Sequence, residues 1–113
     1  MEAQIIELTN ADFDSTISQG LTLVDFWAPW CMPCKLMGPI FDTVAEQLGD
    51  KVRFAKVNID KELELANRLG IQSIPTLMLF KDGVDVDVRI GLTKAPELIA
   101  MITPWRRLPP KVL

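Results

Sequence analysis

The sequence LTLVDFWAPWCMPCK, residues 21–35, carries the strongest structural signal in the chain. Its first part, Leu21–Ala28, is an almost continuous apolar run, which is typical of a strand buried on both faces of a parallel sheet. Its second part holds both cysteines of the chain, Cys31 and Cys34, at the start of an expected helix that ends near Leu48. A buried strand that leads directly into a helix indicates an α/β protein.

The segments on either side of this stretch predict the order βαβαβαββα. Four further strands are expected at Gln4–Glu7, Val52–Ile59, Thr76–Phe80 and Val84–Ile90. Three further helices are expected: one capped by Thr9 or Asn10, one capped by Asp60 with Leu63, Ala66 and Leu69 inward, and one capped by Thr93 and ended by Pro104. Layer packing then predicts a mixed five-stranded sheet flanked by about four helices, with the last strand at an edge.

Length and charge restrict the class of protein. The 113 residues suffice for one domain, which we place at residues 1–104, followed by an irregular tail at residues 105–113. A net charge of −3 gives no basic surface for nucleic acid. The first twenty residues lack the apolar core of a signal peptide, and no apolar run approaches the roughly 20 residues that span a bilayer. We therefore expect a cytoplasmic protein that contacts neither nucleic acid nor membrane.

Four interpretations of the Cys-x-x-Cys motif compete. A zinc or iron–sulfur site usually needs four soft ligands, whereas this chain has two cysteines and no histidine. Haem attachment requires a histidine after Cys34, where Lys35 stands. A purely structural disulfide that closes so short a loop would stabilise little. A metal site would require a dimer that shares two such pairs, so a redox-active dithiol is the favoured interpretation, and we expect no metal and no bound cofactor.

The position of the motif suits dithiol chemistry. The thiolate is the nucleophile in disulfide exchange, and a helix N-terminus stabilises negative charge on Cys31. Cys34 lies one helical turn further on, close enough to attack a mixed disulfide on Cys31. Pro33 is compatible with the first turn, where its missing N–H costs no helix bond.

At this point the chain resembles a known family. Trp27-Ala28-Pro29-Trp30-Cys31-x-Pro33-Cys34-Lys35 is similar to the active-site signature of thioredoxins. Further matches, over roughly residues 4–103, are Ser73-Ile74-Pro75-Thr76, Asp25, Lys56, Gly83 and Gly91. The resemblance implies the thioredoxin fold and protein-disulfide reduction, with electrons from an NADPH- or ferredoxin-linked thioredoxin reductase. It also implies that Cys31 attacks, that Cys34 resolves, and that Pro75 is a cis proline lining the client groove.

Two charged residues have alternative interpretations. Asp25 shares a strand face with apolar neighbours, so it is either a carboxyl tolerated at a strand end or a buried acid with a raised pKa that exchanges protons with Cys34. Lys56 lies on the next strand of the chain. It is either a neighbour of Asp25 that tunes this acid or an ordinary surface lysine.

An apolar rim is expected around Cys31, formed by Trp30, Met32, Ile74 and Pro75, with Gly91 allowing close backbone approach. An aromatic residue beside a reactive thiol suits a surface that docks client proteins, although ordinary packing would also explain Trp30. The chain departs from the family at Met32, where glycine is usual, and it is one residue shorter between Gly91 and Lys94.

The sequence thus predicts a monomeric thiol-disulfide oxidoreductase, an electron carrier that reduces the disulfides of client proteins. Three alternatives stay open. The first is a thioredoxin-like binding subunit without turnover, and the presence of both cysteines and Asp25 argues against it. The second is a thiol oxidant or isomerase, which often carries a histidine in the motif, whereas this chain has none. The third is a glutaredoxin-like enzyme that uses glutathione, and Trp30 and Pro33 argue against it.

Overall fold

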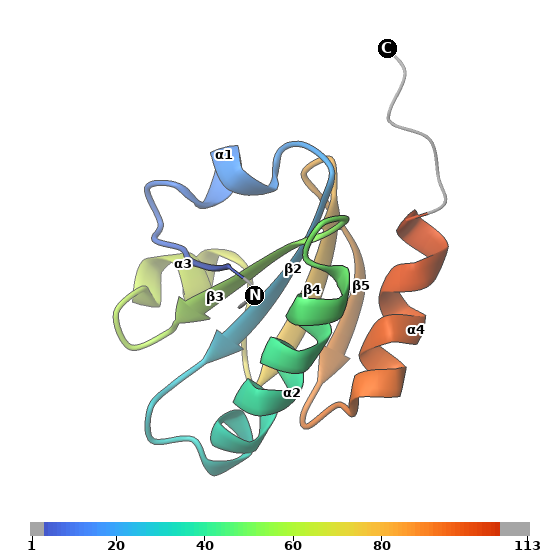
Figure 1. The fold of residues 1–113 in the computed structure, drawn as a ribbon. Coiled ribbons are helices and arrows are strands. Elements are labelled where there is room, and N and C mark those ends of the chain that lie inside the picture. Colours follow the sequence, from blue (N-terminus) through green and yellow to red (C-terminus); the bar gives the residue numbers. More distant parts are fainter. Residues whose placement is uncertain (1–3, 107–113) are drawn as a thin grey trace.

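The fold of the chain, in a computed structural model that describes residues 4–106, is shown in Figure 1. The elements follow the predicted order: β1 (Ile5–Glu7), α1 (Phe13–Ile17), β2 (Leu21–Trp27), α2 (Met32–Leu48), β3 (Arg53–Asn58), α3 (Leu63–Arg68), β4 (Thr76–Lys81), β5 (Val84–Ile90) and α4 (Ala95–Arg106). Within residues 4–106, no helix is both long enough and apolar enough to cross a membrane.

The strands form one mixed sheet in the order β1-β3-β2-β4-β5. The pairs β1–β3 and β3–β2 are parallel, whereas β4 and β5 are antiparallel to their neighbours. β2 is therefore the central strand, and six of its seven residues are buried. The predicted mixed sheet, the buried strand at Leu21–Ala28 and the edge position of β5 are confirmed.

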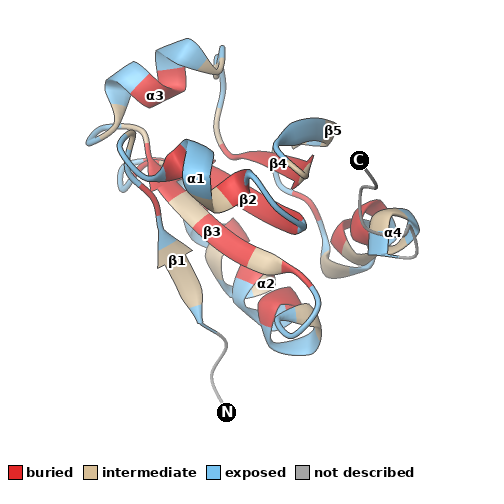
Figure 2. Cartoon of the chain, turned by 90° about the horizontal axis from the view of Figure 1, so that it is seen from above, coloured by how far each residue is buried: buried red, intermediate tan, exposed pale blue. Residues whose placement is uncertain are grey.

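Helices cover both faces of the sheet, as Figure 2 shows. α2 and α4 pack on one face, where Phe41 meets Phe54 edge-to-face. α1 and α3 pack on the other face, where Phe13 meets Phe80 edge-to-face. Because helices lie on both sides of the central strand, most positions of β2 are apolar, which explains the almost continuous apolar run in the sequence.

The starts of two short helices differ from the prediction. α1 is preceded by Asp12 rather than capped by Thr9 or Asn10, because residues 9–12 close a turn in which the Thr9 N–H donates to Asp12 Oδ1 at 2.7 Å. α3 follows Glu62 rather than Asp60. Its predicted inward residue Leu63 is 62% exposed, and the neighbouring Leu65 is buried instead.

The end of α4 also corrects the prediction. We expected Pro104 to end the last helix and the chain to be irregular from residue 105, but α4 extends through Pro104 to Arg106. Trp105 packs against the core cluster between the sheet and α2. This apolar contact offsets the backbone hydrogen bond that Pro104 cannot donate. The predicted boundary therefore falls inside the helix, and the rest of the expected tail, residues 107–113, lies outside the described residues.

Candidate active site

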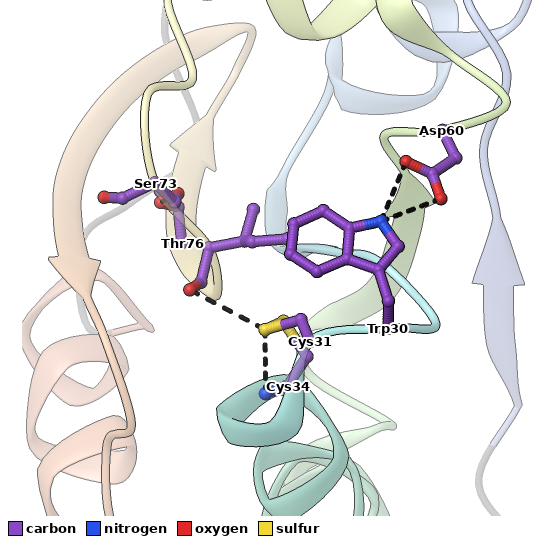
Figure 3. The surroundings of a disulfide bond; sticks show 7 residues. Trp30, Cys31, Cys34, Asp60, Ser73 and Thr76 are labelled. Carbon is purple, nitrogen blue, oxygen red and sulfur yellow. Dashed lines mark hydrogen bonds between the residues drawn. A yellow bond between two sulfur atoms is a disulfide. The ribbon is translucent and has the colours of Figure 1, made fainter.

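The two cysteines lie where β2 has ended and α2 begins. Cys31 is the N-cap residue of α2, with extended backbone angles, and Met32 and Pro33 form the first helical positions. The Cys34 backbone N–H donates to Cys31 Sγ at 3.2 Å, as Figure 3 shows. Cys31 and Cys34 are joined by a disulfide. After reduction, the same N–H and the helix N-terminus stabilise negative charge on Cys31 Sγ.

The two cysteine residues are buried, whereas Trp30 and Met32 beside them are open to solvent. Cys31 is 5% exposed and Cys34 is 4% exposed. By contrast, Trp30 is 68% exposed and Met32 is 63% exposed. Large exposed apolar side chains next to shielded reactive atoms form the kind of surface that binds a protein partner.

The loop before β4 lies against the Cys31 end of the disulfide. Cys31 Sγ is 3.8 Å from the Ile74 carbonyl oxygen, and the Ile74–Pro75 peptide bond is cis. The Gly91 N–H donates to the Pro75 carbonyl oxygen at 2.8 Å. The structure thus brings Cys31, Ile74, Pro75 and Gly91 together, although Pro75 itself is buried. A cis bond at Pro75 agrees with what the resemblance implied.

Gly91 is required by its backbone conformation. Its φ of +93° lies in the region that favours glycine. Among the described residues, no atom outside its immediate neighbours lies within 4 Å of the place where a Cβ would stand. Close approach within this chain therefore does not explain the glycine.

Asp25 is a buried acid in the central strand. It is 1% exposed, and its Oδ1 has no hydrogen-bond partner among the described residues. Burial raises the pKa of Asp25 from its ordinary value of 3.8 to about 7, because the charged form loses its hydration. Two residues further along the same strand, Trp27 contacts the cluster that contains Cys31 and Cys34. The sequence prediction that Asp25 is buried among apolar groups is confirmed.

Lys56 interacts with Asp25 through its charge. The two residues are register partners in the β2–β3 pair. The Lys56 Nζ, however, lies 3.9 Å from Asp42 Oδ1 on α2 and 5.6 Å from the centre of the Phe41 ring. The positive charge of Lys56 lowers the pKa of Asp25 and the negative charge of Asp42 raises it, both less than burial does. Lys56 is thus neither a fully solvated lysine nor the ion-pair partner of Asp25.

Sequence reasoning missed two acidic residues near this site. Asp42 holds the Lys56 ammonium group. Asp60 accepts hydrogen bonds from Trp30 Nε1 at 3.2 Å and 3.0 Å through its two oxygens. One feature of the sequence could have indicated Asp60. This residue follows β3, and because β2 and β3 are parallel, the residues after both strands lie at the same edge of the sheet. Nothing in the sequence pattern indicated Asp42.

The described residues contain no cluster of three or more metal-ligating side chains of His, Cys, Asp or Glu. An α/β sheet that presents a Cys-x-x-Cys at a helix start, beside a cis-proline loop, defines the class of dithiol–disulfide oxidoreductases.

Comparisons with known proteins identify the family within this class. The thioredoxin family model matches residues 4–104, and the chain belongs to the thioredoxin family. It is 40% identical to a thioredoxin of Bacillus subtilis, over 77% of this chain and 84% of that protein. It is 46% identical to thioredoxin 1 of Synechococcus elongatus, over 74% of this chain and 80% of that protein.

Solved structures agree with this assignment. A thioredoxin of Malassezia sympodialis superposes with a TM-score of 0.82 at 34% identity, covering 92% of both chains. A mutant thioredoxin of Halobacterium salinarum superposes with a TM-score of 0.85 at 32% identity, covering 95% of both chains. The predicted resemblance and fold are confirmed: the chain is a thiol-disulfide oxidoreductase of the thioredoxin type that reduces protein disulfides through the redox-active pair Cys31–Cys34. Its family implies two kinds of partner, a thioredoxin reductase and client proteins with disulfides.

Proposed function

We propose that Cys31 is the attacking thiolate and that Cys34 resolves the mixed disulfide. Cys31 Sγ attacks one sulfur of a client disulfide, forms a new S–S bond and releases the other client sulfur as a thiolate. Cys34 then loses its proton and attacks Cys31 Sγ, which releases the second client thiol and closes the Cys31–Cys34 disulfide. Two electrons pass to the client in each cycle. The observation that carries this assignment is the N-cap position of Cys31, whose Sγ accepts the Cys34 N–H.

In this proposal Asp25 accepts the proton from Cys34 and returns it in the reverse direction. A carboxyl group with a pKa of about 7 is suited to proton transfer near neutral pH. Lys56 tunes this acid through its charge, and Asp42 limits the effect by holding the Lys56 ammonium group. Lys56 is therefore a positioning residue in this scheme.

The surface that receives clients is the docking rim, which we define as Trp30, Met32, Pro33, Ile74, Pro75 and Gly91. Trp30 and Met32 offer exposed apolar area, and the loop at Ile74 and Pro75 lies beside Cys31 Sγ. A client strand that approaches this loop brings its disulfide close to Cys31 Sγ.

A reductase returns two electrons and two protons to the Cys31–Cys34 disulfide, and we propose that it is linked to NADPH or to ferredoxin. The protein works as a cytoplasmic monomer without a bound cofactor. A composition with only two cysteines, too few for a disulfide-dense secreted scaffold, supports this proposal.

The roles of the two cysteines are tested with Cys31→Ser and Cys34→Ser. Cys31→Ser should abolish reduction of insulin by dithiothreitol through this protein. Cys34→Ser should make one attack and accumulate as a covalent mixed disulfide with the client, visible on a non-reducing gel. In the reduced wild type, iodoacetamide should label Cys31 faster than Cys34, with the double variant as the unlabelled control. Equal labelling rates, or faster labelling of Cys34, contradict the assignment.

A further inference from the structure

The indole of Trp30 is held in place although it lies at the surface. It is 68% exposed, and its Nε1 donates to both carboxylate oxygens of Asp60. In Figure 3 the Nε1 edge of the ring faces Asp60 and the opposite edge extends away from that carboxylate. An exposed indole N–H can also bond to water, so this contact adds little to folding stability. The contact instead restricts the motion of the Trp30 indole ring.

Asp60 is itself fixed by the end of β3. Its backbone N–H donates to Asn58 Oδ1 at 2.9 Å, and Asn58 is only 6% exposed. The Ile59 N–H donates to the Trp27 carbonyl oxygen at 2.9 Å, which ties the same turn to the end of β2. The carboxylate therefore stands on a turn that is anchored to the centre of the sheet, close to where the Cys-x-x-Cys segment begins.

We propose that Asp60 is a positioning residue that orients Trp30 for the docking of client proteins. The inference rests on the docking role proposed above for Trp30. A side chain that must be immobilised when a client binds costs free energy, and this cost falls when the side chain is already held in its bound orientation. Asp60 contacts the indole and takes no part in the sulfur chemistry, so it acts on client binding and not on the exchange step.

A double-mutant cycle tests the proposal in the full chain. The four proteins are wild type, Asp60→Ala, Trp30→Phe and the double variant, each assayed for reduction of a protein disulfide with a reductase as electron source. Asp60→Ala should raise KM about threefold with kcat unchanged, because the freed indole must then be immobilised when the client binds. The same change should have no further effect in Trp30→Phe, which keeps an aromatic side chain but lacks the indole N–H.

Two companion variants sharpen the test. Asp60→Asn keeps an acceptor oxygen and should restore most of the KM. Asp50→Ala removes an exposed aspartate at the far end of α2 and should leave KM unchanged. In nitrogen NMR of the three indole N–H groups, the Trp30 signal should show greater fast motion in Asp60→Ala and regain rigidity in Asp60→Asn.

The possible results separate this inference from the proposed function. If Trp30→Ala leaves KM unchanged, the docking role of Trp30 is wrong and the inference fails with it. If Trp30→Ala raises KM but Asp60→Ala does not, only the inference is overturned. A KM effect of Asp60→Ala that persists in Trp30→Phe also overturns it, because Asp60 then contacts the client directly.

Discussion

Asp25 carries a carboxyl group that the fold keeps out of water. The folded chain holds the Asp25 proton up to about pH 7, whereas the unfolded chain releases it near pH 3.8. The contribution of Asp25 to the free energy of unfolding is therefore neutral below pH 3.8, falls as the pH rises toward 7, and levels off above 7. A group retained at such a cost in stability is a good candidate for a role in catalysis.

Asp25→Asn should therefore stabilise the protein at high pH. We expect the free energy of unfolding to rise on the order of 2 kcal/mol near pH 8, because the burial of a charge is removed while a buried polar amide remains. Near pH 3 the gain should vanish, since Asp25 is then protonated in both states. Urea unfolding of the oxidised protein at the two pH values measures this difference, with Asp50→Asn as the exposed control. A variant that is less stable than wild type near pH 8 would falsify the linkage.

Met32 is the residue at which the motif departs from its family, and it is 63% exposed. A flexible thioether adapts to differently shaped apolar partners, and glycine in its place would loosen the first turn of α2. Met32→Gly should change KM to different extents for different protein disulfides, while the redox potential shifts by less than about 30 mV.

Titration against a glutathione couple gives the potential of Met32→Gly, and steady-state assays with two clients give KM. Leu63→Ala is the matched control, because Leu63 is a similarly exposed apolar residue on α3. Identical KM values for both clients would show that Met32 is neutral for client choice.

At the scale of the elements, local rules located the start of α2 but not the start of α3 or the end of α4. Capping is a short-range property, so a cysteine before Met32-Pro33 could be placed at the helix start from the sequence. The start of α3 depends on the turn that closes on Asn58, and the end of α4 depends on tertiary contacts of Trp105. Neither signal is contained in the helix sequence itself.

The last turn of α4 should depend on Trp105. Trp105→Ala removes an apolar contact with the core and should lower the free energy of unfolding by about 2 kcal/mol, less than a fully buried Trp would cost. Arg106→Ala, at the exposed neighbouring position, should change it by less than about 0.5 kcal/mol. Denaturant midpoints of the three proteins provide the comparison. Equal midpoints for wild type and Trp105→Ala would contradict the packing argument.

At the scale of the whole molecule, the sequence predicted the strand types, the helix order and the core of the site. Cys31, Cys34 and the buried Asp25 could be identified because each lies within one strand–helix segment. The Trp30–Asp60 contact joins residues 30 positions apart, and the Lys56–Asp42 pair joins two elements. Both depend on the order of strands in the sheet, which no local pattern specifies.

The central position of β2 also determines which parts of the protein unfold locally and which unfold only with the whole sheet. β2 has paired strands on both sides and helices over both faces, so exposing its amides to hydrogen exchange requires breaking most of the molecule. The edge strands can open alone at lower free energy. Because the Cys-x-x-Cys segment follows β2 closely in the chain, opening of an edge strand leaves the dithiol in position until the central sheet itself unfolds.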